Sequence, residues 1–207
     1  MSGFDNYADL QGSVSTWLGR SDLAANIPDF ITLFEASANR SIIARAMLTT
    51  VSLTTVQGVA NLPSDYIGAD QVEWKGDPTA NLEYIDPAIF NMWFPTFPTA
   101  AGTPGTPEFY TIQVNTISIV PFDDTSPTLL TYYQKIPPLA SNTTNWLLQD
   151  WPDAYLFGTL VEANAFIMDA TKGELWLARR DQAFNEITEI ENRFRGPAAI
   201  HSTGPIV

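Results

Sequence analysis

The stretch Leu53-Thr54-Thr55-Val56-Gln57-Gly58-Val59-Ala60-Asn61-Leu62 marks the point where the sequence changes from helical to β patterning. From about Thr49 onward, β-branched residues alternate with other residues, as they do in strands with one buried face. Gln57-Gly58 stands between two such runs, and a glycine there suits the positive φ angles of a two-residue turn. We therefore predict a β-hairpin here and a β-rich region after it.

Further strands are expected at several places, with turn residues between them. They are Ile67 to Trp74, Asn81 to Ile85, Phe109 to Val114, Thr116 to Pro121 and Leu129 to Lys135. Asp86-Pro87 predicts the start of a short helix through Trp93, because proline suits the first turn of a helix. The segment Phe94 to Pro107 is rich in proline and glycine, so we expect a projecting loop there.

Helical patterns flank this β-rich region on both sides. Apolar residues at steps of three and four predict one helix from Tyr7 to Leu18 and a second that begins at Pro28. A third helix is expected from Trp151 to Met168. Thr171-Lys172-Gly173 is expected to turn the chain into a fourth, whose apolar face ends at Phe194.

The order of these elements predicts an α+β fold, in the form of a four-helix bundle with an inserted β-rich domain and an extended C-terminal tail. We expect residues 1–46 and 145–195 to form the helical bundle domain. Residues 47–144 are expected to form the β-rich domain with its projecting loop 94–107, and residues 196–207 to form the tail.

Composition excludes most catalytic chemistry. The chain has 10 Lys and Arg against 23 Asp and Glu, a formal net charge of −13, and such an acidic surface repels nucleic-acid phosphates. It has no cysteine and one histidine, His201, which excludes thiolate sites and any triad or zinc site that needs two histidines. We expect no enzymatic activity, no cofactor and no metal.

No segment is expected to target or span a membrane. The closest apolar stretch, Ala154 to Met168, is interrupted by Glu162 and Asn164, whereas a spanning helix needs roughly 18 uninterrupted apolar residues. Met1 to Asp9 lacks the basic residues of a secretory signal. The protein is therefore expected to act where it is made.

Several motifs, in order along the chain, resemble a known family. They are Trp17-Leu18-Gly19-Arg20-Ser21-Asp22-Leu23, Ile27-Pro28-Asp29-Phe30-Ile31, Glu35-Ala36, Asn39-Arg40, Leu62-Pro63-Ser64-Asp65-Tyr66, Gly105-Thr106-Pro107-Glu108-Phe109-Tyr110, Leu130-Thr131-Tyr132-Tyr133, Asn145-Trp146-Leu147-Leu148 and Pro152-Asp153-Ala154-Tyr155-Leu156-Phe157-Gly158. Over about residues 7–195 the chain resembles the head-to-tail adaptor (connector) proteins of tailed bacteriophages, relatives of the tail accessory factor of short-tailed phages.

The resemblance implies a structural role without a substrate. Such adaptors form a ring, typically of twelve copies, that docks on the portal protein, extends the DNA channel and offers a platform to a tail nozzle or other tail component. The expected partners are thus the portal, neighbouring adaptor subunits and the tail, with genomic DNA passing through unbound. The expected location is the head-tail interface of the virion, after assembly in the host cytoplasm.

The resemblance also points to the C-terminal extension as the portal contact. The residues we assign to it are Arg195, Pro197, Ile200, His201, Pro205, Ile206 and Val207. A short apolar tail with no core of its own to join is typical of a segment that a partner orders. The alternative is a frayed terminus.

The loop is a second candidate contact, with a neighbouring subunit or the tail, through Phe94, Phe97, Pro98 and Pro104. Aromatic residues among prolines suit a stiff arm that inserts into another surface, and a closed ring needs one projecting and one receiving face. The alternative is a loop folded back over its own domain. Residues 47–144 also hold much of the acidity, which suits either a channel along which DNA slides or a solubilising surface.

Two other function classes remain open. Asp123-Asp124 is a pair of carboxylates, and paired carboxylates serve as acid and base in enzymes that cleave peptidoglycan. Together with Glu108 the pair could also supply oxygen ligands for calcium, although the sequence has no EF-hand pattern. Trp74, Trp93, Trp146 and Trp151 are the candidates for a sugar-stacking platform, which would make the protein a carbohydrate-binding module. Turn formation and core packing are the structural alternatives.

Overall fold

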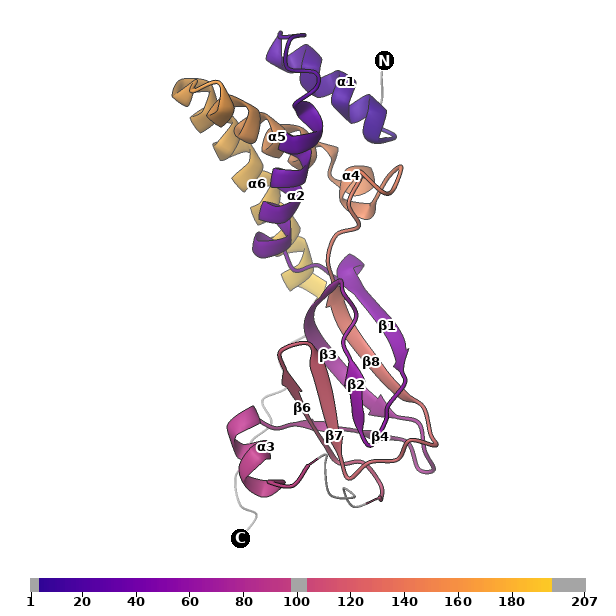
Figure 1. Cartoon of the computed structure of the whole chain (residues 1–207). Coiled ribbons are helices and arrows are strands. Elements are labelled where there is room, and N and C mark those ends of the chain that lie inside the picture. Colours follow the sequence, from indigo (N-terminus) through magenta and orange to yellow (C-terminus); the bar gives the residue numbers. More distant parts are fainter. Residues whose placement is uncertain (1–3, 98–103, 195–207) are drawn as a thin grey trace. The chain divides into compact units, whose positions relative to one another are not determined.

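The structure, a computed structural model, describes residues 4–97 and 104–194. The chain forms two compact units, one made of the residues up to Ala46 together with those from Ile136 onward, and the other of Met47–Lys135. The chain thus leaves the β unit between Lys135 and Ile136, before the expected boundary between residues 144 and 145. The protein is of mixed α+β class, as the sequence predicts (Figure 1).

The helical unit contains five α-helices within the described residues. They are α1 (Tyr7–Leu18), α2 (Ile27–Ser41), α4 (Trp146–Asp150), α5 (Pro152–Phe166) and α6 (Ala170–Phe194), and a 3₁₀ turn, η1 (Arg45–Met47), follows α2. Helix α5 is central, since α1, α2, α4 and α6 all pack on it. Its buried residues therefore lie on more than one face, among them Tyr155, Gly158 and Leu160.

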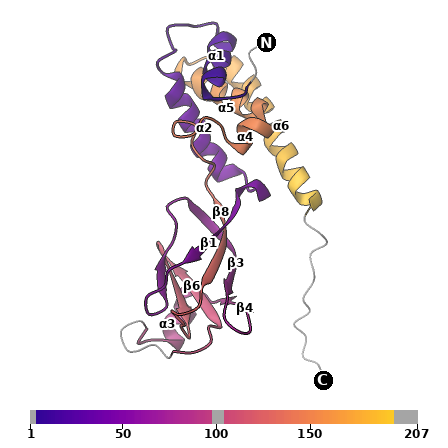
Figure 2. The same ribbon diagram turned by 90° about the vertical axis from the view of Figure 1, so that its right-hand side faces the viewer.

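The expected four-helix bundle is not confirmed. Helices α2, α5 and α6 lie alongside one another, whereas the short α1 crosses them near one end (Figures 1 and 2). One cause is the anchoring of α1, whose Tyr7 backbone N–H donates to the Thr143 carbonyl at 2.9 Å. The buried stripe of α1 is also short, with Leu10, Ser13 and Val14.

Close packing between α2 and α5 depends on Gly158. A Cβ atom added there would lie 2.0 Å from the Phe34 ring, and this ring also contacts Tyr155 with centroids 5.0 Å apart. Glycine is therefore the residue that lets these two helices approach.

The turn between α5 and α6 lies earlier than Thr171-Lys172-Gly173, so that prediction is wrong. It lies at Met168, with φ of 58°, and Asp169, whose carboxylate accepts a 3.1 Å hydrogen bond from the Lys172 backbone N–H. An aspartate in this position satisfies a free N–H of the first helical turn, so α6 begins at Ala170. Helix α4 is a second difference, because no helix is predicted there from the sequence.

The β unit is a sandwich of two four-stranded sheets. One sheet has the order β1 (Leu48–Leu53), β8 (Thr128–Gln134), β3 (Tyr66–Trp74) and β4 (Ala80–Asn81). The other has the order β2 (Val59–Asn61), β7 (Thr116–Val120), β6 (Phe109–Gln113) and β5 (Glu83–Tyr84). Helix α3 (Pro87–Trp93) packs beside β6.

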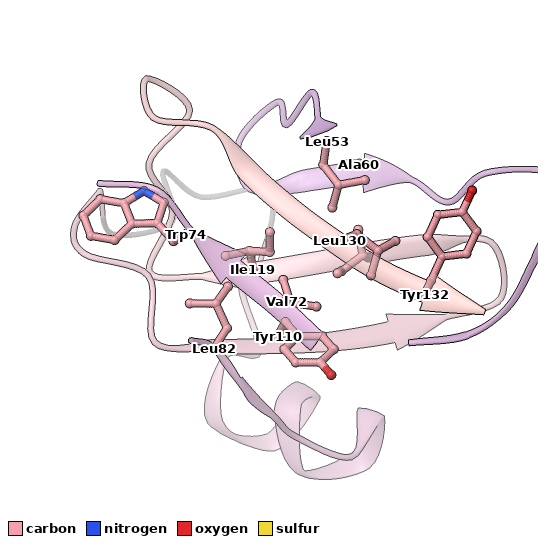
Figure 3. Close-up of a cluster of buried hydrophobic side chains, with 10 residues drawn as sticks. Leu53, Ala60, Val72, Trp74, Leu82, Tyr110, Ile119, Leu130 and Tyr132 are labelled. Atoms are coloured by element: carbon pink, nitrogen blue, oxygen red, sulfur yellow. The ribbon is translucent and has the colours of Figure 1, made fainter. Parts of the chain in front are cut away.

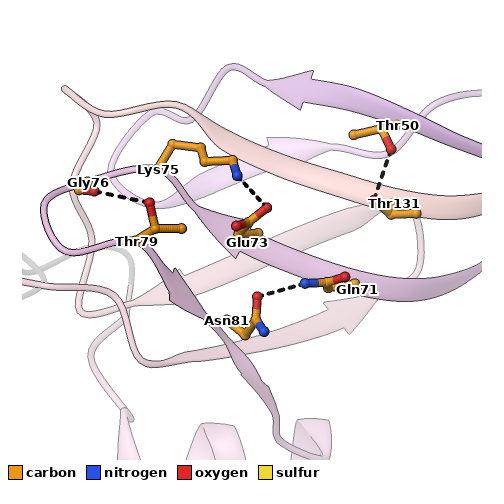
Figure 4. A network of polar contacts seen from close by, with 8 residues as sticks. All are labelled: Thr50, Gln71, Glu73, Lys75, Gly76, Thr79, Asn81 and Thr131. Carbon is orange, nitrogen blue, oxygen red and sulfur yellow. Dashed lines mark hydrogen bonds and ion pairs between the residues drawn. The ribbon is translucent and has the colours of Figure 1, made fainter.

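The core of the β unit lies between the sheets. Leu130, Val72 and Tyr132 from one sheet meet Ile119 and Tyr110 from the other (Figure 3). The outward face of the β1–β8–β3–β4 sheet carries polar cross-strand pairs instead, such as Thr50 with Thr131 at 3.0 Å and Gln71 with Asn81 at 2.7 Å (Figure 4). The alternation of apolar and polar side chains along each strand therefore gives this sheet a buried apolar face and a solvent-exposed polar face.

The predicted hairpin is correct in its turn and wrong in its strands. Gln57 and Gly58 both have positive φ, 54° and 76°, and Val56 and Val59 exchange hydrogen bonds of 2.9 and 3.1 Å across the turn. The flanking strands, however, belong to different sheets, because β1 pairs with β8 and β2 pairs with β7. The turn thus carries the chain from one layer of the sandwich to the other.

Candidate interaction surfaces

The residues predicted to bind the portal, Arg195, Pro197, Ile200, His201, Pro205, Ile206 and Val207, lie outside the described residues. Their role stays a prediction.

The predicted loop contact is only partly described, because Pro98 also lies outside. Phe94 and Phe97 are half-buried and pack on the ring of Phe90, with centroids 5.2 and 5.4 Å away. Pro104 is exposed and bridges to Phe122. Within one copy, the two aromatic residues thus pack on their own unit. A contact of Phe94, Phe97, Pro98 and Pro104 with a neighbouring subunit or the tail stays a prediction.

Asp123 and Asp124 hold loops together. Asp124 accepts hydrogen bonds from the backbone N–H groups of Gln57 and Gly58 at 2.6 and 3.1 Å, and so fixes the turn between the sheets. Asp123 accepts from Thr125 and from the Trp74 indole Nε1 at 3.1 Å. Hydrogen bonds from Ser126 and Thr125 keep the pKa of Asp123 well below its usual range. A carboxyl group that stays ionised in this way is a poor general acid.

The tryptophan platform is not assembled. Trp74 is buried in the sandwich, and its ring lies so close to Gly76 that an added Cβ would meet it at 2.0 Å. Trp93 is exposed on the same unit, whereas Trp146 and Trp151 belong to the helical unit.

An exposed aromatic cluster lies on one flank of the helical unit. Phe157 of α5 and Trp176 of α6 stack with centroids 5.7 Å apart, and Trp17 of α1 meets both edge-on at 6.1 and 5.6 Å. Trp17 is still 52% exposed. Leu175, which precedes Trp176 in the sequence, is 51% exposed. Aromatic side chains of this kind are typical of protein interfaces.

A groove of about 460 Å³ lies where α5 turns into α6. Its wall is mainly apolar and includes Val161, Ala165, Met168 and Leu177, and Met168 is 90% exposed at its rim. Asn164 also lines it and is only 2% exposed. Within the described residues its Oδ1 has no hydrogen-bond partner, while its Nδ2 donates to the Leu160 carbonyl at 2.7 Å.

The β unit has an exposed apolar stripe of its own. Ile89, Met92 and Trp93 of α3 are 42%, 68% and 55% exposed, and their spacing places them on one side of that helix. Large exposed side chains that lie together in this way mark contact sites more often than isolated ones do.

Buried polar residues tie the returning chain to the helical unit. Glu35 of α2 accepts hydrogen bonds from the Leu139 backbone N–H at 2.8 Å and the Tyr155 hydroxyl at 3.1 Å. Asn145 donates to the same hydroxyl at 2.6 Å and to the Pro137 carbonyl at 2.8 Å. Asn39 accepts from the Ile136 backbone N–H at 2.8 Å. The segment after β8 is thus fixed along α2.

Among the described residues there is no cluster of three or more His, Cys, Asp or Glu suited to a metal ion. None of the helices in this part of the chain is long and apolar enough to cross a membrane. Exposed apolar and aromatic side chains on both units are typical of a protein that binds other proteins.

Comparison with known families gives the same class. The family model described as SU10 adaptor protein matches residues 5–201. The chain belongs to this family of phage head-to-tail adaptors, and is a structural protein of the virion that acts in tail assembly with the portal and tail components. No curated protein sequence matches it.

Proposed function

We propose that this adaptor forms a ring of the family's usual twelve copies, which docks on the portal, continues the DNA channel and presents an attachment platform to the tail. The observation that carries this proposal is the family match, which covers residues 5–201 and therefore both units. Exposed apolar side chains on each unit support it, because a ring subunit needs contacts to neighbours as well as to the layers above and below.

The charge of the β unit supports a place beside DNA. Residues 47–135 contain two basic residues, Lys75 and Lys135, against nine acidic ones, which leaves −7. Lys75 forms an ion pair with Glu73 at 2.6 Å, and the Lys135 ammonium donates one hydrogen bond to the Ser64 carbonyl at 3.3 Å, so only Lys135 keeps a positive charge that no carboxylate pairs with in the described residues. Such a surface repels DNA and lets it slide.

The C-terminal residues from Arg195 to Val207 are proposed to contact the portal, and assembly is proposed to take place in the host cytoplasm. The test is the mass of complexes formed by the full chain and the cognate portal, compared with a chain that ends before Arg195. Multi-copy loading of the full chain alone supports both the ring and the tail contact. Equal loading of both chains contradicts the role of the tail, and no loading of either contradicts the adaptor function.

A further inference from the structure

The edge strand β1 differs from the other free edges of the sandwich. It has six residues, Leu48–Leu53, whereas the strands at the other edges, β2, β4 and β5, have two or three. β1 pairs with β8 without a register shift and carries neither a charge nor a proline. Short length, charged residues, prolines and bulges are the usual protection of an edge against pairing with another chain. β1 lacks all four.

One hydrogen bond at the end of the sheet shows which groups of each strand face which neighbour. The Lys75 backbone N–H donates to the Pro127 carbonyl at 2.8 Å, in the register of the β3–β8 ladder. Antiparallel pairs alternate between hydrogen-bonded and non-hydrogen-bonded ones. At this end of β8, the odd-numbered residues therefore bond to β3 and the even-numbered residues bond to β1.

The same alternation identifies the open groups of β1. Its Val51 is the partner of Leu130, an even-numbered residue of β8, so Val51 bonds to β8. Thr50 and Ser52 therefore direct their backbone N–H and C=O away from β8. Their side chains are exposed, and within the described residues β8 is the only strand that pairs with β1. The outer side of β1 thus presents donors and acceptors at the spacing of a strand (Figure 4).

The apolar face of the sheet is also incomplete at β1. Val51, Leu130 and Val72 are paired in one row across three strands. Leu130 and Val72 are 0% and 1% exposed, whereas Val51 is only half-buried. An added strand with an apolar residue beside Val51 would cover what remains of it, because side chains on one face of a sheet pack against their neighbours in the row.

A second copy does not match this edge. The other free edges in the described chain are too short, and antiparallel pairing of β1 with β1 has two-fold symmetry, which closes a dimer and not a larger ring. β units with a net charge of −7 also repel one another. In the proposed assembly the portal contact belongs to the residues from Arg195 onward. The partner that remains for β1 is the tail component.

We propose that β1 is the edge on which the tail docks, and that an extended segment of the tail component pairs with Leu48–Leu53 and adds a strand to this sheet. This inference rests on the proposed attachment of the adaptor to the tail. Main-chain hydrogen bonds to Thr50 and Ser52 hold the segment. It has about six residues, with an apolar one at every second position to cover Val51 and no excess of acidic ones, since the unit is acidic.

A proline on the open side of β1 gives a sharp test. Ser52→Pro removes an N–H that faces away from β8, so the β1–β8 ladder stays intact while the proline ring stands in the way of an added strand. The matched control is Asn61→Pro at the short edge β2. Ile119 N–H donates to the Gly58 carbonyl at 2.8 Å, so the even-numbered residues of this segment bond to β7 and the Asn61 N–H faces away from it.

The first readout is the affinity of the purified cognate tail component for preassembled portal–adaptor complexes. Both variants are expected to load on the portal like the wild-type chain. Ser52→Pro is expected to weaken tail binding by more than about tenfold, and Asn61→Pro by less than about twofold.

The second readout, hydrogen exchange of the wild-type chain, needs no substitution. The Thr50 and Ser52 amides are expected to exchange fast in the portal–adaptor complex and to become protected when the tail component binds, while the Asn61 amide stays unchanged. If Ser52→Pro fails to load on the portal, these amides decide the question alone.

Different failures have different meanings. If the tail binds and the two amides stay unprotected, or Ser52→Pro binds the tail as tightly as Asn61→Pro, the β1 contact is wrong while the adaptor function stands. If the amides become protected on assembly with the portal alone, the occupant of the edge is another copy or the portal, and the proposal is overturned. If wild-type complexes do not bind the tail component, the proposed tail attachment itself fails.

Discussion

Replacing Glu35 tests whether the buried network needs a charge or only an acceptor. Glu35 is 6% exposed and has no Lys or Arg partner among the described residues. Burial raises its pKa, although the hydrogen bonds from Leu139 and Tyr155 act in the opposite direction. The ionised carboxylate is therefore less stable in the folded protein than in the unfolded chain.

The expected effects of two substitutions differ in sign. Glu35→Gln keeps an oxygen for both donors and removes the charge, so at pH 7 it is expected to raise the free energy of unfolding, by about 1.4 kcal/mol for each unit by which folding raises the pKa. Glu35→Ala leaves the Leu139 N–H and the Tyr155 hydroxyl without their acceptor at sites that are 2% and 0% exposed. At about 1–3 kcal/mol for each orphaned group, it is expected to cost roughly 2–6 kcal/mol.

The pH dependence follows from linkage. Because the folded pKa is above the unfolded one, the stability contributed by the protonated group is fully present below the unfolded pKa and is lost as pH rises through the folded pKa. Wild-type and Glu35→Gln chains should thus be equally stable at low pH and diverge as pH rises.

Urea unfolding between pH 4 and 8 measures this difference, and hydrogen exchange at the Leu139 amide reports the bond directly. Protection of that amide should persist in Glu35→Gln and fall in Glu35→Ala. A glutamine variant as unstable as the alanine variant at pH 7 would show that the negative charge itself is required and would refute the reasoning.

Three further substitutions test the sandwich and the helix packing. Gly58→Ala is expected to destabilise the β unit by more than about 1 kcal/mol in urea unfolding, because φ is +76° and the new Cβ would lie 2.5 Å from the Ile119 carbonyl oxygen; an unchanged midpoint would contradict this. Gly158→Ala, whose Cβ would lie 2.0 Å from Phe34, is expected to cost about 1–3 kcal/mol in the helical unit and to lower its melting temperature, whereas Gly12→Ala, where nothing lies within 4 Å, serves as the control. Asp123 has a lowered folded pKa, so its contribution is present above the unfolded pKa and is lost as pH falls through the folded one; wild-type and Asp123→Asn chains should therefore converge in stability toward low pH, and a constant difference would oppose this assignment.

Helices and strands whose apolar residues recur with a clear period were predictable from the sequence. The first helix begins after Asn6, whose side chain accepts from the backbone N–H groups of Ala8 and Asp9, and it ends at Leu18 as expected. Strands β3, β6, β7 and β8 also lie within about two residues of their predicted positions, because alternation reports directly which face is buried.

Features set by partners distant in sequence were not predictable. Local patterning cannot tell that β1 and β2 join different sheets, since this depends on β8 and β7, which lie far along the chain. Local patterning gives no reason for Glu35 to be buried, and only the fold brings it to Leu139 and Tyr155, 104 and 120 positions away. The start of α6 after Asp169 could have been predicted, because an aspartate just before a helix is a common N-cap.

The distribution of charge assigns different tasks to the two units. Of the 10 basic residues, eight belong to the helical unit, and those of the β unit are the two already engaged at Glu73 and Ser64. In the proposed ring, electrostatic attraction between copies of net charge −13 would come from the helical units, where Arg179 forms no ion pair in the described chain. In the same proposal, contacts of the β unit with other copies would depend on apolar groups such as the α3 stripe, because its excess of carboxylates repels both other copies and DNA.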